Sequence, residues 1–229
     1  MTGTIIRIAV DAMGGDRYPD VLVEGSVAAL ERFRDIEIVL VGDETKVGDY
    51  IARTFNERAS SGKKGLKESL GPRIRVVHAH EVIEMSESPG RAIRSKKDSS
   101  IVVCNKLCRS GEADAVISAG NTGAAMASSL LYMGRLEGVS RPAIMALFPS
   151  EKNYVCILDV GANTDCKPGN LYQFGVMASI YAQYILGYSQ PRVGLLNIGE
   201  ERSKGNELTC EAFEMLEKSG LNFVGNIEG

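Results

Sequence analysis

The feature that most constrains the fold is the alternation of short apolar runs with segments of helical periodicity along the whole chain. Several of these runs are β-branched and continuously apolar, which is typical of strands covered by helices on both faces. We expect strands at residues 5–12, 36–43, 73–80, 113–120, 142–149, 154–161, 192–199 and 222–226. We expect helices near residues 19–34, 45–57, 98–110, 122–134, 168–187 and 205–219. This alternation predicts an α/β fold with a doubly wound, mostly parallel sheet.

A length of 229 residues fits one large domain or two small ones, and we predict a single α/β domain over residues 1–229. The Gly/Ser/Lys-rich segment 60–72 is typical of a surface insertion. The formal net charge of -3 gives no global basic field for nucleic acid. Because neither a signal peptide nor a membrane-spanning run is evident, we expect a cytoplasmic protein.

The cysteines and histidines give weak signals. The 5 cysteines are odd in number and lack CxxC spacing, so a disulfide framework is not expected. His78 and His80 are the only histidines. Because they are two residues apart, their side chains would share one face of a strand, as a pair of metal ligands would. The alternative interpretation is a polar strand end without a metal. So few histidines make a Ser-His-Asp or Cys-His mechanism hard to build.

Small and polar residues follow nearly every predicted strand. The strand ends include DAMGGD (11–16), SAGNTGA (118–124), DVGAN (159–163), NIGEE (197–201) and GNIEG (225–229). Ligands bind at the carboxyl ends of strands in open parallel sheets. Glycine lets backbone N–H groups approach an anion, and a following helix adds its positive N-terminus. Since GxGxxG after the first strand and GxxxxGK[ST] are missing, we predict an anion site without a nucleotide loop.

Each loop also has a purely structural interpretation. Gly14-Gly15 fits a plain turn, with Asp16 capping the helix that begins near Pro19. Thr122 fits a cap for the helix after SAGN. Several such loops after apolar strands nevertheless favour a shared site.

Basic residues lie at two kinds of position. Lys204 and Lys167 follow strand ends. Each is interpreted either as an ammonium group that binds phosphate or as an ordinary surface lysine. The run PGRAIRSKKDSS (89–100) forms either a solvated face or a docking patch for an acidic partner. Its basic side chains are Arg91, Arg94, Lys96 and Lys97.

A combination of motifs resembles the bacterial PlsX phosphate acyltransferases, also called acyl-ACP:phosphate transacylases. The motifs are AVDAMGGD, HAHEVIE, ISAGNTGA, RPA, DVGAN followed by KP, QPRVGLLNIGEE, KGNEL and GNIEG, in family order. The resemblance covers essentially the whole chain. Family members continue beyond the last motif with a DGF-[TV]-GN loop, so we expect this chain to be an N-terminal portion.

The resemblance implies transfer of a fatty acyl group from acyl carrier protein to inorganic phosphate. The acyl phosphate would feed phospholipid synthesis through a glycerol-phosphate acyltransferase. The implied fold is a Rossmann-like α/β/α sandwich related to isocitrate dehydrogenase and phosphotransacetylase. It also implies a homodimer with peripheral membrane association, and no cofactor or metal.

The resemblance and the strand ends together identify the candidate site residues. Lys204, Asn121, Asn163 and Asp11 are assigned catalytic roles, with Lys204 as the principal charge on phosphate. The other expected phosphate or substrate contacts are Gly14, Gly15, Asp16, Thr122, Gly123, Asp159, Gly161, Lys167, Asn206 and Asn226.

Alternatives stay open at this point. Asp11, Asp16 and Asp159 orient a donor or accept a proton from phosphate, or else they hold a divalent metal. A second hypothesis for the function is a phosphotransacetylase-like enzyme or a metal-dependent dehydrogenase on the same fold. A third hypothesis is an inactive fragment that only binds carrier protein.

Overall fold

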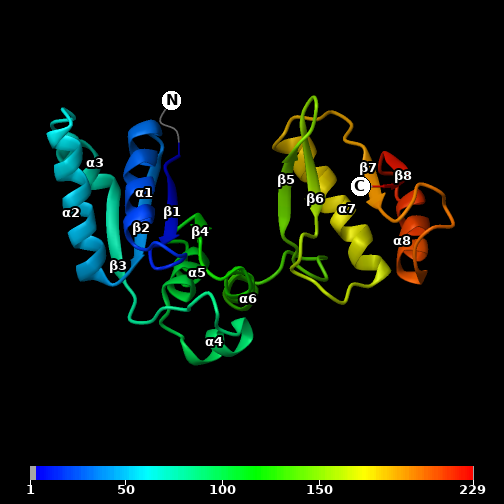
Figure 1. Cartoon of the computed structure of the whole chain (residues 1–229), viewed down its shortest axis with the longest axis horizontal. Coiled ribbons are helices and arrows are strands. Elements are labelled where there is room, and N and C mark those ends of the chain that lie inside the picture. The colour runs from blue at the N-terminus through cyan, green and yellow to red at the C-terminus, as the bar shows by residue number, and fades with distance from the viewer. Residues whose placement is uncertain (1–3, 229) are drawn as a thin grey trace. The chain divides into compact units, whose positions relative to one another are not determined.

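A computed structural model describes residues 4–228 of the chain, which divides into two compact units, Met1–Gly134 and Arg135–Gly229 (Figure 1). Each unit is described by itself. The prediction of a single domain over residues 1–229 stays a prediction.

The first unit contains a parallel four-stranded sheet. Its strands are β1 (Ile6–Asp11), β2 (Ile36–Gly42), β3 (Ile74–His78) and β4 (Ala115–Ile117). The order is β3-β2-β1-β4, with both β2 and β4 pairing in parallel with β1. The segments that follow β1 and β4 therefore leave the same edge of the sheet side by side, which is where ligands bind in folds of this kind.

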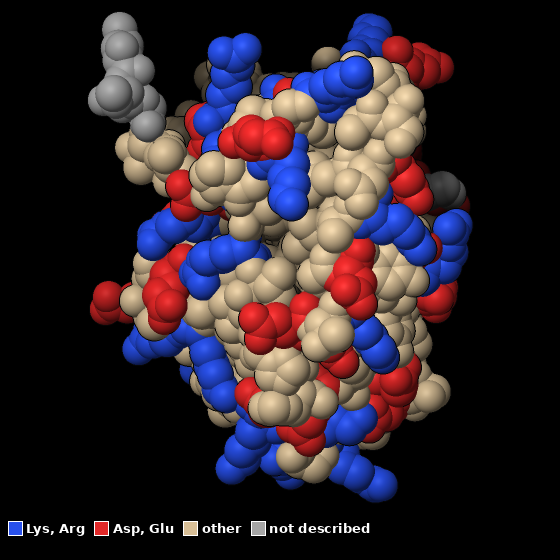
Figure 2. All heavy atoms as spheres, turned by 90° about the vertical axis from the view of Figure 1, so that its left-hand side faces the viewer, with Lys and Arg blue, Asp and Glu red and all other residues tan. Residues whose placement is uncertain are grey.

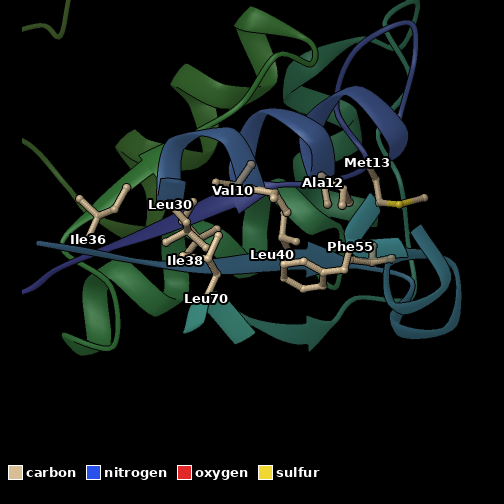
Figure 3. Close-up of a cluster of buried hydrophobic side chains, with 12 residues drawn as sticks. Val10, Ala12, Met13, Leu30, Ile36, Ile38, Leu40, Phe55 and Leu70 are labelled. Atoms are coloured by element: carbon tan, nitrogen blue, oxygen red, sulfur yellow. The ribbon is translucent and has the colours of Figure 1, made fainter. Parts of the chain in front are cut away.

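Helices cover both faces of this sheet. On one face, Val10 and Leu40 pack with residues of α1 (Asp20–Arg32) and α2 (Glu44–Ser60) in the cluster shown in Figure 3. On the other face, Val39 and Val41 pack with residues of α5 (Ser100–Ser110). Alternate residues of one strand thus enter different cores, which explains why residues 8–10 of β1 and 38–41 of β2 are apolar without interruption. The predicted doubly wound α/β arrangement is confirmed.

Three short elements were not expected from the sequence: α3 (Leu66–Leu70), the 3-10 turn η1 (Gly71–Arg73) and α4 (Pro89–Ser95). Leu70 is only 6% exposed and belongs to the main core, so the surface interpretation of segment 60–72 is wrong at this end. The guanidinium of Arg73 donates to the carbonyls of Leu30 (2.7 Å) and Phe33 (2.8 Å). These contacts tie the segment to the end of α1.

A buried amide joins α5 to α6 (Thr122–Tyr132). The Asn105 side chain is fully buried and donates to the Ile101 carbonyl (2.8 Å) and the Ser128 hydroxyl (3.0 Å). Its oxygen accepts from the Ser129 hydroxyl at 2.9 Å. Because α6 begins directly after the SAGN loop, this network fixes the helix that presents the loop.

The second unit contains two pairs of strands. β5 (Met145–Pro149) and β6 (Tyr154–Leu158) are antiparallel, whereas β7 (Val193–Leu196) and β8 (Phe223–Ile227) are parallel. The helices α7 (Pro168–Tyr184) and α8 (Glu207–Glu217) pack together, and Phe213 meets Phe223 edge to face at 5.0 Å between ring centroids. All of the predicted strands and helices are present, with ends that differ by a few residues.

Charges of both signs cover the part of the surface around α2 and α3, where Figure 2 shows Lys and Arg interspersed with Asp and Glu. This mixture agrees with the small net charge of -3. Within residues 4–228, no helix has the length and apolar character needed to cross a membrane.

Candidate functional site

The loops that follow β1 and β4 pack against each other with only glycine at the point of approach. A Cβ on Gly14 would lie 2.6 Å from Asp11 Oδ2 and 2.8 Å from the Gly120 nitrogen. Gly15 has φ of +99°, a conformation that glycine adopts readily, and a Cβ there would lie 3.1 Å from the Ala119 carbonyl oxygen. The predicted convergence of DAMGGD and SAGNTG therefore occurs within the first unit.

Asp11 links the two loops through hydrogen bonds of its carboxylate. Its carboxylate accepts from the Ser118 hydroxyl (2.7 Å) and from the Met13 N–H (3.3 Å). The Ser118 oxygen in turn accepts from the Gly120 N–H at 3.1 Å. The sequence did not single out Ser118, although it lies at the carboxyl end of an apolar strand, as Asp11 does. Asp11 is thus placed to hold the loops together.

Burial raises the pKa of the Asp11 carboxyl. The residue is 3% exposed, and the loss of solvation raises the pKa of its carboxyl, while hydrogen bonds from Ser100, Ser118 and Met13 act in the opposite direction. The direction of this shift favours the neutral acid.

The helix α6 begins with its N-terminus at these loops. Its cap is Asn121, whose Oδ1 accepts from the Ala124 N–H at 3.0 Å, so the alternative in which Thr122 caps the helix is wrong. Thr122 is exposed. Thr122 and Gly123 occupy the first two helical positions, where N–H groups have no acceptor within the helix. These groups are available to an anion at the positive end of the helix.

The amide nitrogen of Asn121 is also engaged. It lies 3.0 Å from the Glu87 carbonyl oxygen, 3.1 Å from that of Met85 and 3.4 Å from that of Glu84. A Cβ on Gly123 would lie 2.6 Å from Pro89 Cγ. The segment before α4 therefore packs closely on the start of α6.

Asp16 lies exposed on the loop after β1. The residue before the first turn of α1 is Pro19, and no side chain caps this helix. The alternative in which Asp16 caps α1 is therefore wrong.

In the second unit, the residues of the DVGAN loop bond to one another and to segment 142–144. Asp159 accepts from the Ile144 N–H (2.7 Å) through Oδ1 and from the Asn163 N–H (2.8 Å) through Oδ2. The Asn163 side-chain amide donates to the Pro142 carbonyl at 2.9 Å. Gly161 has φ of +113°, which permits the turn. Asp159 and Asn163 thus connect the loop to the segment that precedes β5.

Lys204 lies on a loop that amide side chains hold in place. Asn197 donates to the Lys204 carbonyl (3.0 Å) and to Asn226 Oδ1 (3.2 Å). Asn226 is 6% exposed and donates to the Glu201 carbonyl at 2.9 Å. Lys204 itself is exposed. The backbone of the loop is therefore fixed while the lysine side chain extends into solvent. Asn197 was not recognised from the sequence, where only its NIGEE motif stood out.

Asn206 and Lys167 precede helices. Asn206 caps α8, and its Oδ1 accepts from the Thr209 N–H at 3.0 Å. Lys167 precedes α7 and donates its backbone N–H to Asn170 Oδ1 at 2.8 Å. Nearby, Arg141 pairs with Asp165 at 2.8 Å and lowers the pKa of that carboxyl.

The basic run 89–100 is divided between two environments. Arg91, Arg94 and Lys97 are exposed. Lys96 instead donates to the Val82 carbonyl (2.6 Å) and pairs with Glu87 (2.5 Å), which lowers the pKa of that carboxyl. Its charge is therefore largely balanced within the chain.

The contacts of the two histidines agree with the interpretation of this segment as a polar strand end. His78 Nδ1 accepts from the Glu44 N–H at 3.1 Å, and His78 Nε2 lies 2.9 Å from His80 Nδ1. Among residues 4–228, no group of three or more His, Cys, Asp or Glu side chains is arranged to hold a metal ion.

Known proteins resemble this chain over nearly its whole length. The family model described as fatty acid synthesis protein matches residues 6–229. The phosphate acyltransferase of Pelotomaculum thermopropionicum is 50% identical over 224 residues, which cover 98% of this chain and 61% of the relative. The phosphate acyltransferase of Desulfitobacterium hafniense is 48% identical over 225 residues, covering 98% and 63%. The chain thus spans less than two thirds of the length of these relatives.

A solved structure supports the fold. The EutD phosphotransacetylase from Staphylococcus aureus matches with a TM-score of 0.63 and 17% identity, covering 98% of this chain and 69% of that chain. The predicted relation to the phosphotransacetylase fold is thereby confirmed. With the family model matching nearly every residue, the chain belongs to the fatty acid synthesis protein family that includes the phosphate acyltransferases.

Proposed function

We propose that a family-length protein carrying this sequence transfers a fatty acyl group from the thioester of acyl carrier protein to inorganic phosphate. The observation that carries the proposal is the packing of the Gly14-Gly15 loop against the loop that begins α6. Relatives 48–50% identical bear the name phosphate acyltransferase, which agrees with a protein that binds phosphate.

The reaction needs little covalent chemistry from the protein. A phosphate oxygen attacks the thioester carbon, so a C–O bond forms and the C–S bond breaks. The thiolate leaves and takes up a proton, and the products are the acyl phosphate and the free thiol of the carrier. The protein must align the two reactants and stabilise the oxyanion that develops on the carbonyl. Backbone donors are suited to both tasks.

The first unit supports the binding of phosphate through backbone N–H groups. Those of Thr122 and Gly123 lie at the first turn of α6, and the glycines at 14 and 15 permit close approach. Asp11 holds this arrangement together through Ser118. We assign Asp11 a supporting role, with proton acceptance from phosphate as the alternative.

We retain Lys204 as the cationic partner of phosphate and Gly161, Asn163 and Asn206 as further contacts. These assignments come from the motifs, and Asp16, Asp159, Lys167 and Asn226 belong with them. The fixed backbone and the exposed side chain of Lys204 suit such a role. For Asn163 and Asp159, the contacts within the DVGAN loop support a structural contribution as well.

The remaining parts of the proposal concern partners. Arg91, Arg94 and Lys97 form the exposed basic side chains proposed to meet the acidic carrier protein. A homodimer, peripheral membrane association from the cytoplasm and delivery of product to a glycerol-phosphate acyltransferase complete the proposal.

The test is to incubate the family-length protein with acyl carrier protein thioester and labelled phosphate, and to look for labelled acyl phosphate. We expect product with the carrier thioester and less with a coenzyme A thioester. A preference for coenzyme A would instead support a phosphotransacetylase. Carrier binding without any product would support a binding module.

A matched pair of variants tests the role of Lys204. Lys204→Ala should lower turnover on the order of 100-fold, as expected for loss of a group that stabilises developing charge. Lys152→Ala, which removes another exposed lysine, should leave turnover unchanged. Near-normal turnover of the Lys204 variant would remove this residue from the mechanism.

A further inference from the structure

We propose that Asn121 is a positioning residue that fixes segment 84–87 beside the first turn of α6, and that it donates no hydrogen bond to the substrate. The reaction it serves rests on the proposed function. The placement itself rests on contacts within the first unit.

The donors of Asn121 are all in use. A side-chain amide has two N–H donors. Three carbonyl oxygens surround this nitrogen, those of Glu87 (3.0 Å), Met85 (3.1 Å) and Glu84 (3.4 Å). The two nearer carbonyls take both hydrogens, and the third shares one of them. No N–H remains to stabilise an oxyanion.

The oxygen of the same side chain fixes its orientation. Oδ1 accepts from the Ala124 N–H at 3.0 Å, which makes Asn121 the cap of α6. An amide turned the other way would direct its oxygen at three carbonyl oxygens and its nitrogen at an N–H group. One side chain therefore joins the start of the helix to a segment 34–37 residues earlier in the chain.

Other contacts hold the same segment independently of Asn121. Lys96 donates to the Val82 carbonyl and pairs with Glu87, whose carboxylate also accepts from the Glu84 N–H at 2.8 Å. Pro89 packs against Gly123 so closely that no side chain would fit between them. Asn121 is thus the link between an already ordered segment and the helix terminus.

This link matters for an anion because of the carbonyl dipoles. The three carbonyl oxygens carry partial negative charge close to the end of α6 at which phosphate is proposed to bind. While they accept from Asn121, their charge is compensated by its N–H groups. Freed carbonyls would weaken the attraction of that helix terminus for a dianion.

The experiment uses hydrogen exchange of this chain and the variant Asn121→Ser. Serine keeps an oxygen that caps helices well, but it is too short to reach the three carbonyls and donates only one hydrogen. We expect amide exchange in segment 84–87 to rise on the order of tenfold, with little change in the later turns of α6. Unchanged exchange in this segment would overturn the proposal.

The matched control is Asn206→Ser at the cap of α8, where the same substitution should leave exchange at 84–87 unchanged. Steady-state kinetics of the family-length protein form the second arm. A direct donor would lose turnover without any change in exchange, which overturns the proposal. If the wild type makes no acyl phosphate while exchange still rises in Asn121→Ser, the positioning role stands and the proposed function fails.

Discussion

Substitution of Gly14 by alanine should separate the two loops at the carboxyl edge of the first sheet. The new Cβ would lie 2.6 Å from Asp11 Oδ2, whereas ordinary contacts begin at 3.4 Å, so one group must move by about 0.8 Å. The second contact, 2.8 Å to the Gly120 nitrogen, is backbone and cannot rotate away. Either the loop after β4 shifts or Asp11 turns and loses its hydrogen bond to Ser118.

The magnitude follows from the cost of inserting a methyl group into a filled site. Overpacking of this kind typically costs about 1–3 kcal/mol. The control is Gly25→Ala in α1, where a Cβ meets nothing within 4 Å and the residue is exposed. Alanine at a helical position should stabilise by about 0.5–1 kcal/mol. The free energies of unfolding of the two variants should therefore differ by roughly 1.5–4 kcal/mol.

Urea denaturation monitored by circular dichroism measures this difference, and hydrogen exchange of residues 118–123 locates it. We expect faster exchange in this loop for Gly14→Ala and normal exchange for Gly25→Ala. Equal stability of the two variants, with unchanged exchange in the loop, would refute the account of glycine at position 14.

Three further predictions concern charge, polarity and metals. Burial raises the pKa of Asp11 above its unfolded value, so the stability that it contributes is present below the unfolded pKa and is lost as pH rises through the folded pKa. Asp11→Asn should therefore gain unfolding free energy relative to the wild type as the pH rises above the ordinary aspartate pKa of 3.8. A difference in urea midpoints that stays constant with pH would argue against this. Asn105→Ala should cost about 1–3 kcal/mol because it leaves the Ser128 and Ser129 hydroxyls without this partner, and urea midpoints equal to wild type would contradict that account. Acyl phosphate formation should survive exhaustive chelation, while loss with rescue by magnesium would assign the carboxylates to a metal.

The sequence predicts the regular elements of the fold because periodicity reflects burial directly. The central residues of the strands at 36–43 and 5–12 are apolar on both faces, and the structure covers both faces with helices. Short helices cannot be predicted from periodicity. With 5 residues in α3 and 7 in α4, neither is long enough for a helical period to emerge.

The glycine loops of the site were also predictable, since glycine after a parallel strand has a specific physical use. The partners of the polar side chains were not. Asn121 looks like a donor for substrate in the motif SAGNTGA, but its neighbours 84–87 come from a distant part of the sequence. Asn105 gave no signal because a buried amide is recognised only from the hydroxyl groups packed around it.

The claim that the first unit binds phosphate at its glycine loops is tested most directly by nuclear magnetic resonance of this chain during titration with inorganic phosphate. The account predicts that the backbone amide signals of residues 14–16 and 122–123 shift together and saturate, while chloride at the same ionic strength leaves them in place. Absence of such shifts, or saturable shifts confined to other segments, would contradict it.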